Sequence, residues 1–163
     1  MDGGAMMGSV PKTLWEKTNP ADEFNRIDLS LRCLLLDDGK NRILIDTGLG
    51  TKGSDKFKTM FHIVQPENPL KNALSKIGFS PNDVTHVIFS HLHFDHAGGA
   101  TEINEEGQLI PVFPNAEYFI TESQWKQANQ PNARDRASFL QADFLPLQEA
   151  GLLQLIPENT TII

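Results

Sequence analysis

Residues 90–99 decide both the fold and the candidate site, and they read Ser90-His91-Leu92-His93-Phe94-Asp95-His96-Ala97-Gly98-Gly99. Three of the five histidines of the chain and one aspartate lie within six consecutive positions here. His91, His93 and Asp95 share one parity, so an extended backbone directs their side chains to one side. Imidazole and carboxylate groups are good Zn²⁺ ligands, and the glycines allow the backbone to bend around an ion. The stretch predicts a metal site with four ligands, which are His91, His93, Asp95 and His96.

A purely structural role for this cluster is the alternative. A single histidine is usually packed in the core or lies on the surface. Four ligand-type side chains at the end of an apolar strand are harder to explain in that way, because unpaired polar groups there cost stability unless a metal ion or solvent satisfies them. The sequence therefore favours metal binding over packing.

The rest of the chain predicts a layered α/β domain. Apolar and alternating residues predict a hairpin of strands, and a β-branched run predicts a strand that leads into the histidines. Capping residues and helical spacing of apolar residues predict several helices. The predicted strands are residues 29–36, 42–46, 84–89, 116–120, 152–156 and the start of another at 160–163. The predicted helices are residues 69–77 with Asn68 as cap and Gly78 at the end, 121–128 capped by Thr121, 133–140 and 145–150. Residues 102–107 are predicted to be a polar loop, and residues 54–64 a weak helix or a loop.

Composition narrows the possible partners. The 163 residues suit one domain, and the net charge of −7 disfavours nucleic acid as a partner. The apolar runs are too short to cross a bilayer, and the first ten residues lack the pattern of a signal peptide. Cys33 is the sole cysteine and is predicted to be a small buried hydrophobe. These features predict a soluble, cytoplasmic protein without a membrane partner.

Several side chains outside the cluster receive simpler interpretations. His86 lies within a predicted strand and is expected to be packed or paired, and His62 is expected on the surface. Lys52, together with Lys56 and Lys58, is expected to lie in a solvated loop.

The motif His-x-His-x-Asp-His, which follows residues 84–90, resembles the signature of the metallo-β-lactamase superfamily. The extended form over residues 90–99 is similar to the branch that contains the N-acyl-homoserine lactone lactonases. Residues 44–48, Leu-Ile-Asp-Thr-Gly, match the earlier Asp-Thr-Gly segment of the family, and residues 2–6 and 10–12 resemble the start of lactonase-like members. The resemblance implies an αββα sandwich built from two similar αβ halves. Residues 1–163 look like the first half only, a single partial domain.

The resemblance also implies roles for individual residues. His91 and His93 would bind one metal ion, and Asp95 and His96 a second, with two Zn²⁺ expected and Mn or Fe as alternatives. Asp95 would also be catalytic, because it can orient the attacking hydroxide or accept its proton. Asp46 and Ser90 would support the ligands without binding the metal ions themselves. Asp46 has two open interpretations, an orienting group near the site or a turn former at the end of a strand.

The implied activity is a metal-dependent hydrolase that opens small lactones or related esters by hydroxide attack. Two alternatives remain: a non-catalytic truncated fragment of this fold, or the same fold acting on thioester, phosphodiester or β-lactam substrates. No histidine follows His96, and Asp135 and Asp143 fit no expected ligand motif. Residues 1–163 alone are therefore predicted to bind metal weakly or not at all and to be inactive. An αβ half would expose an apolar sheet face, which predicts a homodimer.

Overall fold

A computed structural model describes residues 1–162 as two compact units. The smaller unit combines Met1–Ser30 with Gly53–Val64, and the larger combines Leu31–Lys52 with residues 65–162. The larger unit contains the β-sheets and every residue of the predicted metal site. It is therefore the part of the chain that positions the candidate site.

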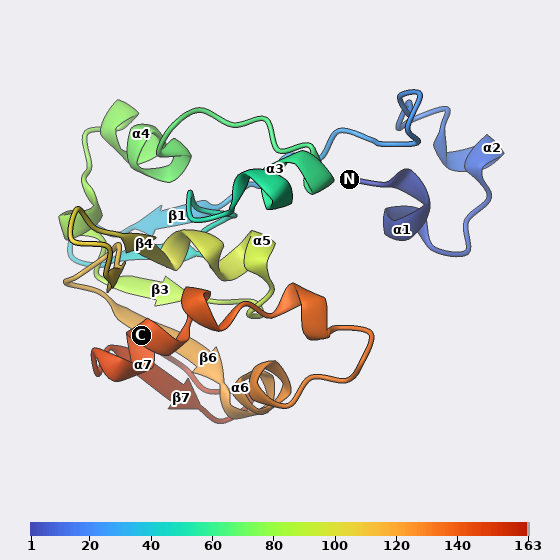
Figure 1. The fold of residues 1–163 in the computed structure, drawn as a ribbon. Coiled ribbons are helices and arrows are strands. Elements are labelled where there is room, and N and C mark those ends of the chain that lie inside the picture. Colours follow the sequence, from blue (N-terminus) through green and yellow to red (C-terminus); the bar gives the residue numbers. More distant parts are fainter. Residues whose placement is uncertain (163) are drawn as a thin grey trace. The chain divides into compact units, whose positions relative to one another are not determined.

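The main sheet of the larger unit has five strands in the order β1-β2-β3-β6-β7 (Figure 1). β1 pairs with β2 in antiparallel fashion, which confirms the predicted hairpin, and the other three pairings are parallel. β6 is as long as the predicted strand but begins one residue later, and the other four strands are shorter than predicted. Their bounds are β1 Leu34–Asp37, β2 Arg42–Ile45, β3 His86–Ile88, β6 Glu117–Thr121 and β7 Leu153–Ile156.

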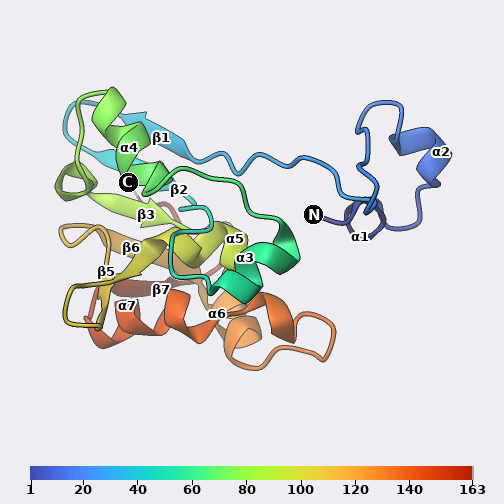
Figure 2. The same cartoon turned by 45° about the horizontal axis from the view of Figure 1, so that its top comes forward.

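Short helices and one further hairpin connect these strands (Figure 2). The hairpin pairs β4, Thr101–Ile103, with β5, Leu109–Pro111. The α-helices of this unit are α4 Pro69–Lys76, α5 Phe94–Ala97, α6 Glu122–Asn129 and α7 Leu145–Glu149. The 3₁₀ helices are η1 Pro81–Asp83, η2 Gly98–Ala100, η3 Arg136–Ser138 and η4 Gln141–Asp143. Nowhere in residues 1–162 is a helix both long and apolar enough to cross a membrane.

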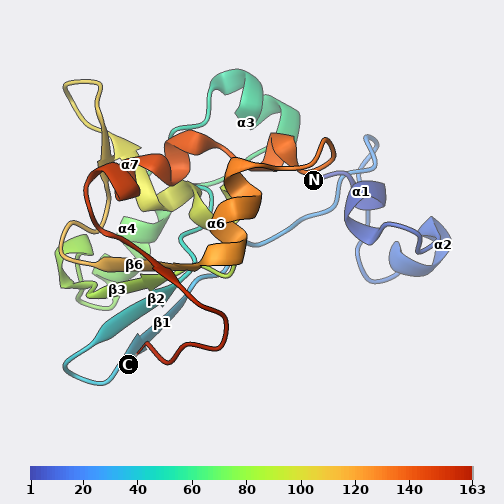
Figure 3. The same cartoon turned by 90° about the horizontal axis from the view of Figure 1, so that it is seen from below.

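One face of the main sheet carries the hydrophobic core. Leu44, Val87 and Tyr118 are aligned across neighbouring strands and are almost completely buried. They belong to one cluster with apolar side chains from α4, α5, α6 and α7, so these helices pack on this face. Figure 3 shows α5, α6 and α7 on the same side of the sheet. In β2 and β3 the most buried residue alternates with less buried neighbours, as the two-residue period of β-structure requires, whereas β6 buries three consecutive residues.

The opposite face of the sheet, which we call the open face, is apolar but less buried. The register aligns Leu34 with Ile45 and Ile45 with Ile88 across three strands. Leu34 and Leu36 are 56% and 47% exposed. The sequence prediction of an exposed apolar sheet face is therefore confirmed, while homodimer formation through it stays a prediction.

Tyr118 links the core face to the chain that precedes β6. Its buried hydroxyl accepts a hydrogen bond from the Phe113 N–H at 3.0 Å and donates one to the Phe113 carbonyl oxygen at 3.2 Å. Tyr118→Phe is expected to lower the free energy of unfolding by about 1–3 kcal/mol, because it leaves the buried Phe113 N–H without a partner. The Phe113 carbonyl oxygen keeps its hydrogen bond from the Ala116 N–H. Urea unfolding measures the change, and an unaltered midpoint would show that the two bonds contribute nothing.

The smaller unit has its own small apolar centre. It contains α1 Gly3–Met7, α2 Lys12–Trp15 and α3 Asp55–Phe61. Trp15 and Ile27 are buried, and the close approach of the Trp15 ring leaves no room for a side chain at Gly3. His62 follows α3 and is exposed, as the sequence predicted.

Three sequence predictions for local structure are wrong. The helix expected at residues 133–140 is reduced to η3, because the Asn132 carboxamide oxygen accepts hydrogen bonds from the Arg134 and Asp135 N–H groups and favours a turn. The polar loop expected at residues 102–107 begins inside β4, and only the turn stabilised by Asn104 remains a loop. Residues 160–162 form no strand, and Ile163 lies outside the described residues.

Candidate metal centre

The segment after β3 presents its polar side chains on one side. Leu92 and Phe94 are buried in the core, whereas His91, His93 and Asp95 are only partly buried. For His91 and His93 this alternation is the one that the sequence predicted from parity. The backbone stays extended up to the cap residue of α5 and then turns into the helix at Phe94. Asp95 and His96 consequently lie on the single helical turn that follows the extended residues.

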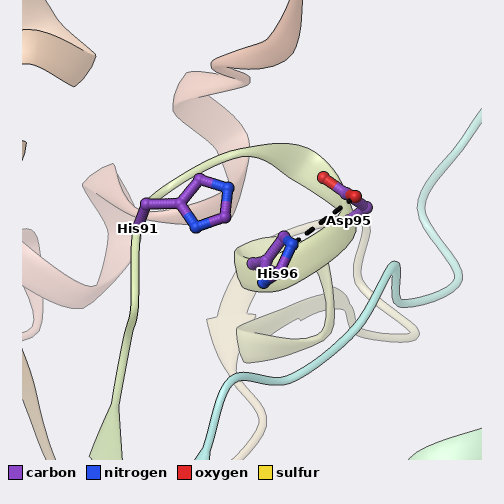
Figure 4. Close-up of side chains that lie close together, drawn as sticks. All are labelled: His91, Asp95 and His96. Atoms are coloured by element: carbon purple, nitrogen blue, oxygen red, sulfur yellow. Dashed lines mark ion pairs between the residues drawn. The ribbon is translucent and has the colours of Figure 1, made fainter. Parts of the chain in front are cut away.

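Three of the predicted ligands come together in space. Atoms of His91, Asp95 and His96 that can bind a metal all lie within 4.8 Å of one another (Figure 4). The rings of His91 and His96 have centroids 4.0 Å apart, and the Asp95 Oδ2 atom lies 3.6 Å from His96 Nε2. Figure 4 shows the His91 side chain on the extended segment and the other two on the turn of α5. A local sequence motif thus becomes one compact set of donor atoms.

His93 lies beside this group but does not belong to it. Its ring packs edge-on against His91 with a centroid distance of 4.5 Å. On another side it packs against Phe139, 4.6 Å away, which is buried in the core. Phe139 holds the orientation of His93, and no signal in the sequence pointed to it.

Asp46 supports the cluster from the end of β2. Its carboxylate accepts hydrogen bonds from the Ser90 N–H at 2.8 Å and the Ser90 hydroxyl at 2.7 Å, and it lies 2.8 Å from His96 Nδ1. A carboxylate accepts hydrogen bonds, so His96 donates its Nδ1–H to Asp46, and Nε2 is the ring nitrogen directed toward Asp95. Asp46 has a positive φ of 55°, as expected for a turn residue. Asp46 therefore lies beside the cluster, where it can orient His96, and it is also the turn residue at the end of β2.

The charge state of His91 suits metal binding. Partial burial lowers the pKa of His91 below its ordinary value, and the neighbouring His96 and His93 lower that pKa further. The carboxylates of Asp95 and Asp46 oppose this change without reversing it. A histidine with a lowered pKa is neutral at pH 7 and keeps a lone pair for a metal ion.

Thr47 is a supporting residue whose role the sequence did not predict. It is buried, and both its N–H and its hydroxyl donate hydrogen bonds to the His96 carbonyl oxygen, at 2.7 and 2.9 Å. Gly48 continues the contact, since its carbonyl oxygen accepts a hydrogen bond from the Gly99 N–H at 2.9 Å. The loop after β2 thus fixes the backbone of the turn that carries the candidate ligands.

The donor set fits a divalent metal ion. Two imidazoles and a carboxylate are the donor types that Zn²⁺ uses in catalytic sites, and Mn²⁺ and Fe²⁺ accept the same types. His96 shows the hydrogen-bond pattern of a metal ligand, with one ring nitrogen held by a carboxylate and the other available. The residues of this chain are therefore suited to a metal on chemical grounds.

Comparisons with known proteins identify the family of this chain. Residues 29–155 match the family model of the metallo-beta-lactamase superfamily. An N-acyl homoserine lactonase from Bacillus sp is 30% identical in an alignment of length 126 that covers 61% of this chain and 50% of the relative. The crystal structure of a probable metal-dependent hydrolase from Staphylococcus aureus superposes with a TM-score of 0.88 at 29% identity, covering 100% of this chain and 57% of the other.

A structure of N-acyl homoserine lactone hydrolase with bound N-hexanoyl-L-homoserine shares the fold, with a TM-score of 0.59 at 23% identity over 91% of this chain and 56% of its own. The chain thus spans about half the length of the proteins that it matches. The family match covers most of the chain, and it includes all four predicted ligands and the Asp46 segment. This chain belongs to the metallo-beta-lactamase superfamily.

Proposed function

We propose that this chain is the metal-binding part of a hydrolase that opens lactones or related esters, with two divalent ions, foremost Zn²⁺. The observation that carries the proposal is the cluster of His91, Asp95 and His96 on a scaffold of this superfamily. The lactone, a cyclic ester, is suggested by the relatives named as N-acyl homoserine lactonases. The missing ligands would lie outside residues 1–163.

Each residue of the site has a distinct task in this proposal. His91 and His93 would hold one ion, and Asp95 and His96 the other. When bound, the ions would lower the pKa of a water molecule toward about 7 and polarise the carbonyl group of the substrate. Asp95 would orient the attacking water and accept its proton, because a carboxylate has a second oxygen available while the first binds a metal.

The residues behind the ligands would hold the site in one arrangement. Asp46 keeps the proton of His96 on Nδ1, so that Nε2 remains free for the ion. Ser90 holds the Asp46 carboxylate through two hydrogen bonds and prevents it from rotating away from His96. Such outer contacts typically contribute a factor of about 10–100 to metal affinity or activity.

The test is the hydrolysis of N-hexanoyl homoserine lactone by two Zn²⁺-loaded proteins. One is residues 1–163, and the other joins these residues to the C-terminal part of the Staphylococcus aureus hydrolase that they do not cover. We expect no measurable ring opening by residues 1–163 alone and clear ring opening by the chimera. Asp95→Asn should remove the activity of the chimera, whereas Asp55→Asn, which changes a fully exposed carboxylate, should retain it.

A folded, metal-loaded chimera can contradict the proposal in two ways. Hydrolysis of a thioester, phosphodiester or β-lactam with the lactone left intact would reject the substrate class. Absence of all four activities would favour a non-catalytic role for this chain.

A further inference from the structure

Lys52 is a buried cation, and the prediction that it lies in a solvated loop is wrong. Its side chain is 10% exposed, and its Nζ atom lies 3.1 Å from Oδ1 of Asp143, which is 4% exposed. The ammonium also donates hydrogen bonds to the Thr101 carbonyl oxygen at 2.7 Å and to the Gly98 carbonyl oxygen. These three contacts use all the donors of a lysine ammonium. Desolvation lowers the pKa of Lys52, and the neighbouring Asp143 opposes that change.

The two carbonyl groups bound by Lys52 lie just after the candidate ligands. Gly98 ends α5, the turn that carries Asp95 and His96, and Thr101 begins the next strand. The last carbonyls of a helix have no partner within it and favour a nearby cation. Lys52 supplies that partner.

The loop from Asp46 to Lys52 contacts this segment along its whole length. Thr47 binds the carbonyl of His96, and the carbonyl of Gly48 accepts from Gly99. At Gly50 the two backbones approach so closely that an added Cβ would lie 2.2 Å from the Gly98 carbonyl oxygen. Lys52 makes the last of these contacts.

Asp143, the ion-pair partner of Lys52, belongs to a segment that also contacts Thr101. Asp143 is part of η4, and the adjacent Ala142 carbonyl accepts a hydrogen bond from the Thr101 hydroxyl at 2.7 Å. Oδ2 of Asp143 is buried with no hydrogen-bond partner among the described residues. If the sole role of Lys52 were to neutralise Asp143, its ammonium would be expected to hydrogen-bond both carboxylate oxygens. Instead, two of the three ammonium donors are directed to the segment that follows the ligands.

We propose that Lys52 is a positioning residue for the metal ligands Asp95 and His96. Its ammonium joins the carbonyls of Gly98 and Thr101 to the Asp143 carboxylate and so fixes the turn on which the two ligands lie. This inference rests on the proposed metal centre. Lys52 itself contacts neither a ligand nor a substrate position, so its effect is transmitted through the backbone.

The first test compares Lys52→Met with wild type by two measurements. Hydrogen exchange of the Gly98 and Gly99 amides in the metal-free chain should become at least about tenfold faster, because the turn is no longer held. The affinity for Co²⁺, followed by its visible absorption, should fall by about 10–100-fold. Lys71→Met is the matched control, since Lys71 pairs with Glu102 nearby but is more exposed, and it should change neither measurement.

The double variant Lys52→Met/Asp143→Leu separates positioning from simple stability. Removing both charges should restore much of the unfolding midpoint in urea, because no buried carboxylate is left unpaired. The Co²⁺ affinity and the fast amide exchange should not recover, since the two carbonyls still lack their donor. Recovery of affinity together with stability would overturn the inference, and so would a single variant that matches wild type in both measurements. If residues 1–163 bind too little Co²⁺ for a titration, as their incomplete ligand set allows, the affinity comparison is made in the chimera. Absence of Co²⁺ binding by the folded chimera would reject the proposed function, while amide exchange still decides whether Lys52 holds the turn.

Discussion

His96→Asn is expected to weaken the binding of a divalent metal by at least about 100-fold, or to make it unmeasurable. The change removes the Nε2 donor that faces Asp95, and it also removes the ring whose Nδ1 is held by Asp46. Loss of an outer partner alone typically costs about 10–100-fold, and here a donor is lost as well. A Co²⁺ titration of wild type and variant measures the effect.

The matched control for this experiment is His62→Asn. His62 is an exposed histidine of the smaller unit, outside the cluster, and has a positive φ of 49° that asparagine tolerates well. It should bind Co²⁺ as wild type does. Equal losses in both variants would show that Co²⁺ binds to surface histidines without selection, and would contradict the assignment of the site.

Gly50→Ala is expected to be the most destabilising single substitution proposed for this chain. Its Cβ would lie 2.2 Å from the Gly98 carbonyl oxygen and 2.7 Å from the Gly98 carbonyl carbon, so the backbones must separate. The positive φ of 67° adds strain for any side chain. Overpacking and backbone strain each cost about 1–3 kcal/mol, so a loss of about 3 kcal/mol or more is expected. Since domains are stable by about 5–15 kcal/mol, urea unfolding will show it clearly.

Gly151→Ala is the control that separates backbone strain from the steric clash at Gly50. Gly151 has a similar φ of 71°, but an added Cβ would meet no atom within 4 Å. It should therefore cost only about 1–2 kcal/mol, the usual penalty of a left-handed backbone. Equal losses in the two variants would mean that the loop after β2 does not need its close approach to the segment of the ligands.

Features encoded by neighbouring residues could be predicted from the sequence. The parity of His91 and His93 against the buried Leu92 is confirmed, whereas Asp95 reaches the cluster from the turn of α5 and not from extended backbone. Local capping was predictable in part, since Asn68 precedes α4 as predicted but its side chain makes no capping hydrogen bond. The Thr121 hydroxyl caps α6, and Gly78 adopts the positive φ expected after α4. These features depend on contacts over a few positions only.

Features that depend on distant residues could not be predicted. The ion pair of Lys52 with Asp143 joins residues far apart in the chain, and each residue looks like an ordinary surface charge when read locally. The contact of Phe139 with His93 also joins residues far apart in the chain.

One prediction failed for a local reason. The helix predicted at residues 133–140 does not form, because the Asn132 side chain competes with helical hydrogen bonds. The single-partial-domain assignment and the homodimer stay predictions.

The central claim is that one cluster of histidines in this chain binds a divalent metal. The most direct test is an NMR titration of the five histidine rings with paramagnetic Co²⁺, which detects weak binding as well as strong binding. The account predicts early broadening of the ring signals of His91, His93 and His96, while those of His62 and His86 remain sharp. Equal broadening of all five rings, or broadening that begins at His62 or His86, would contradict it.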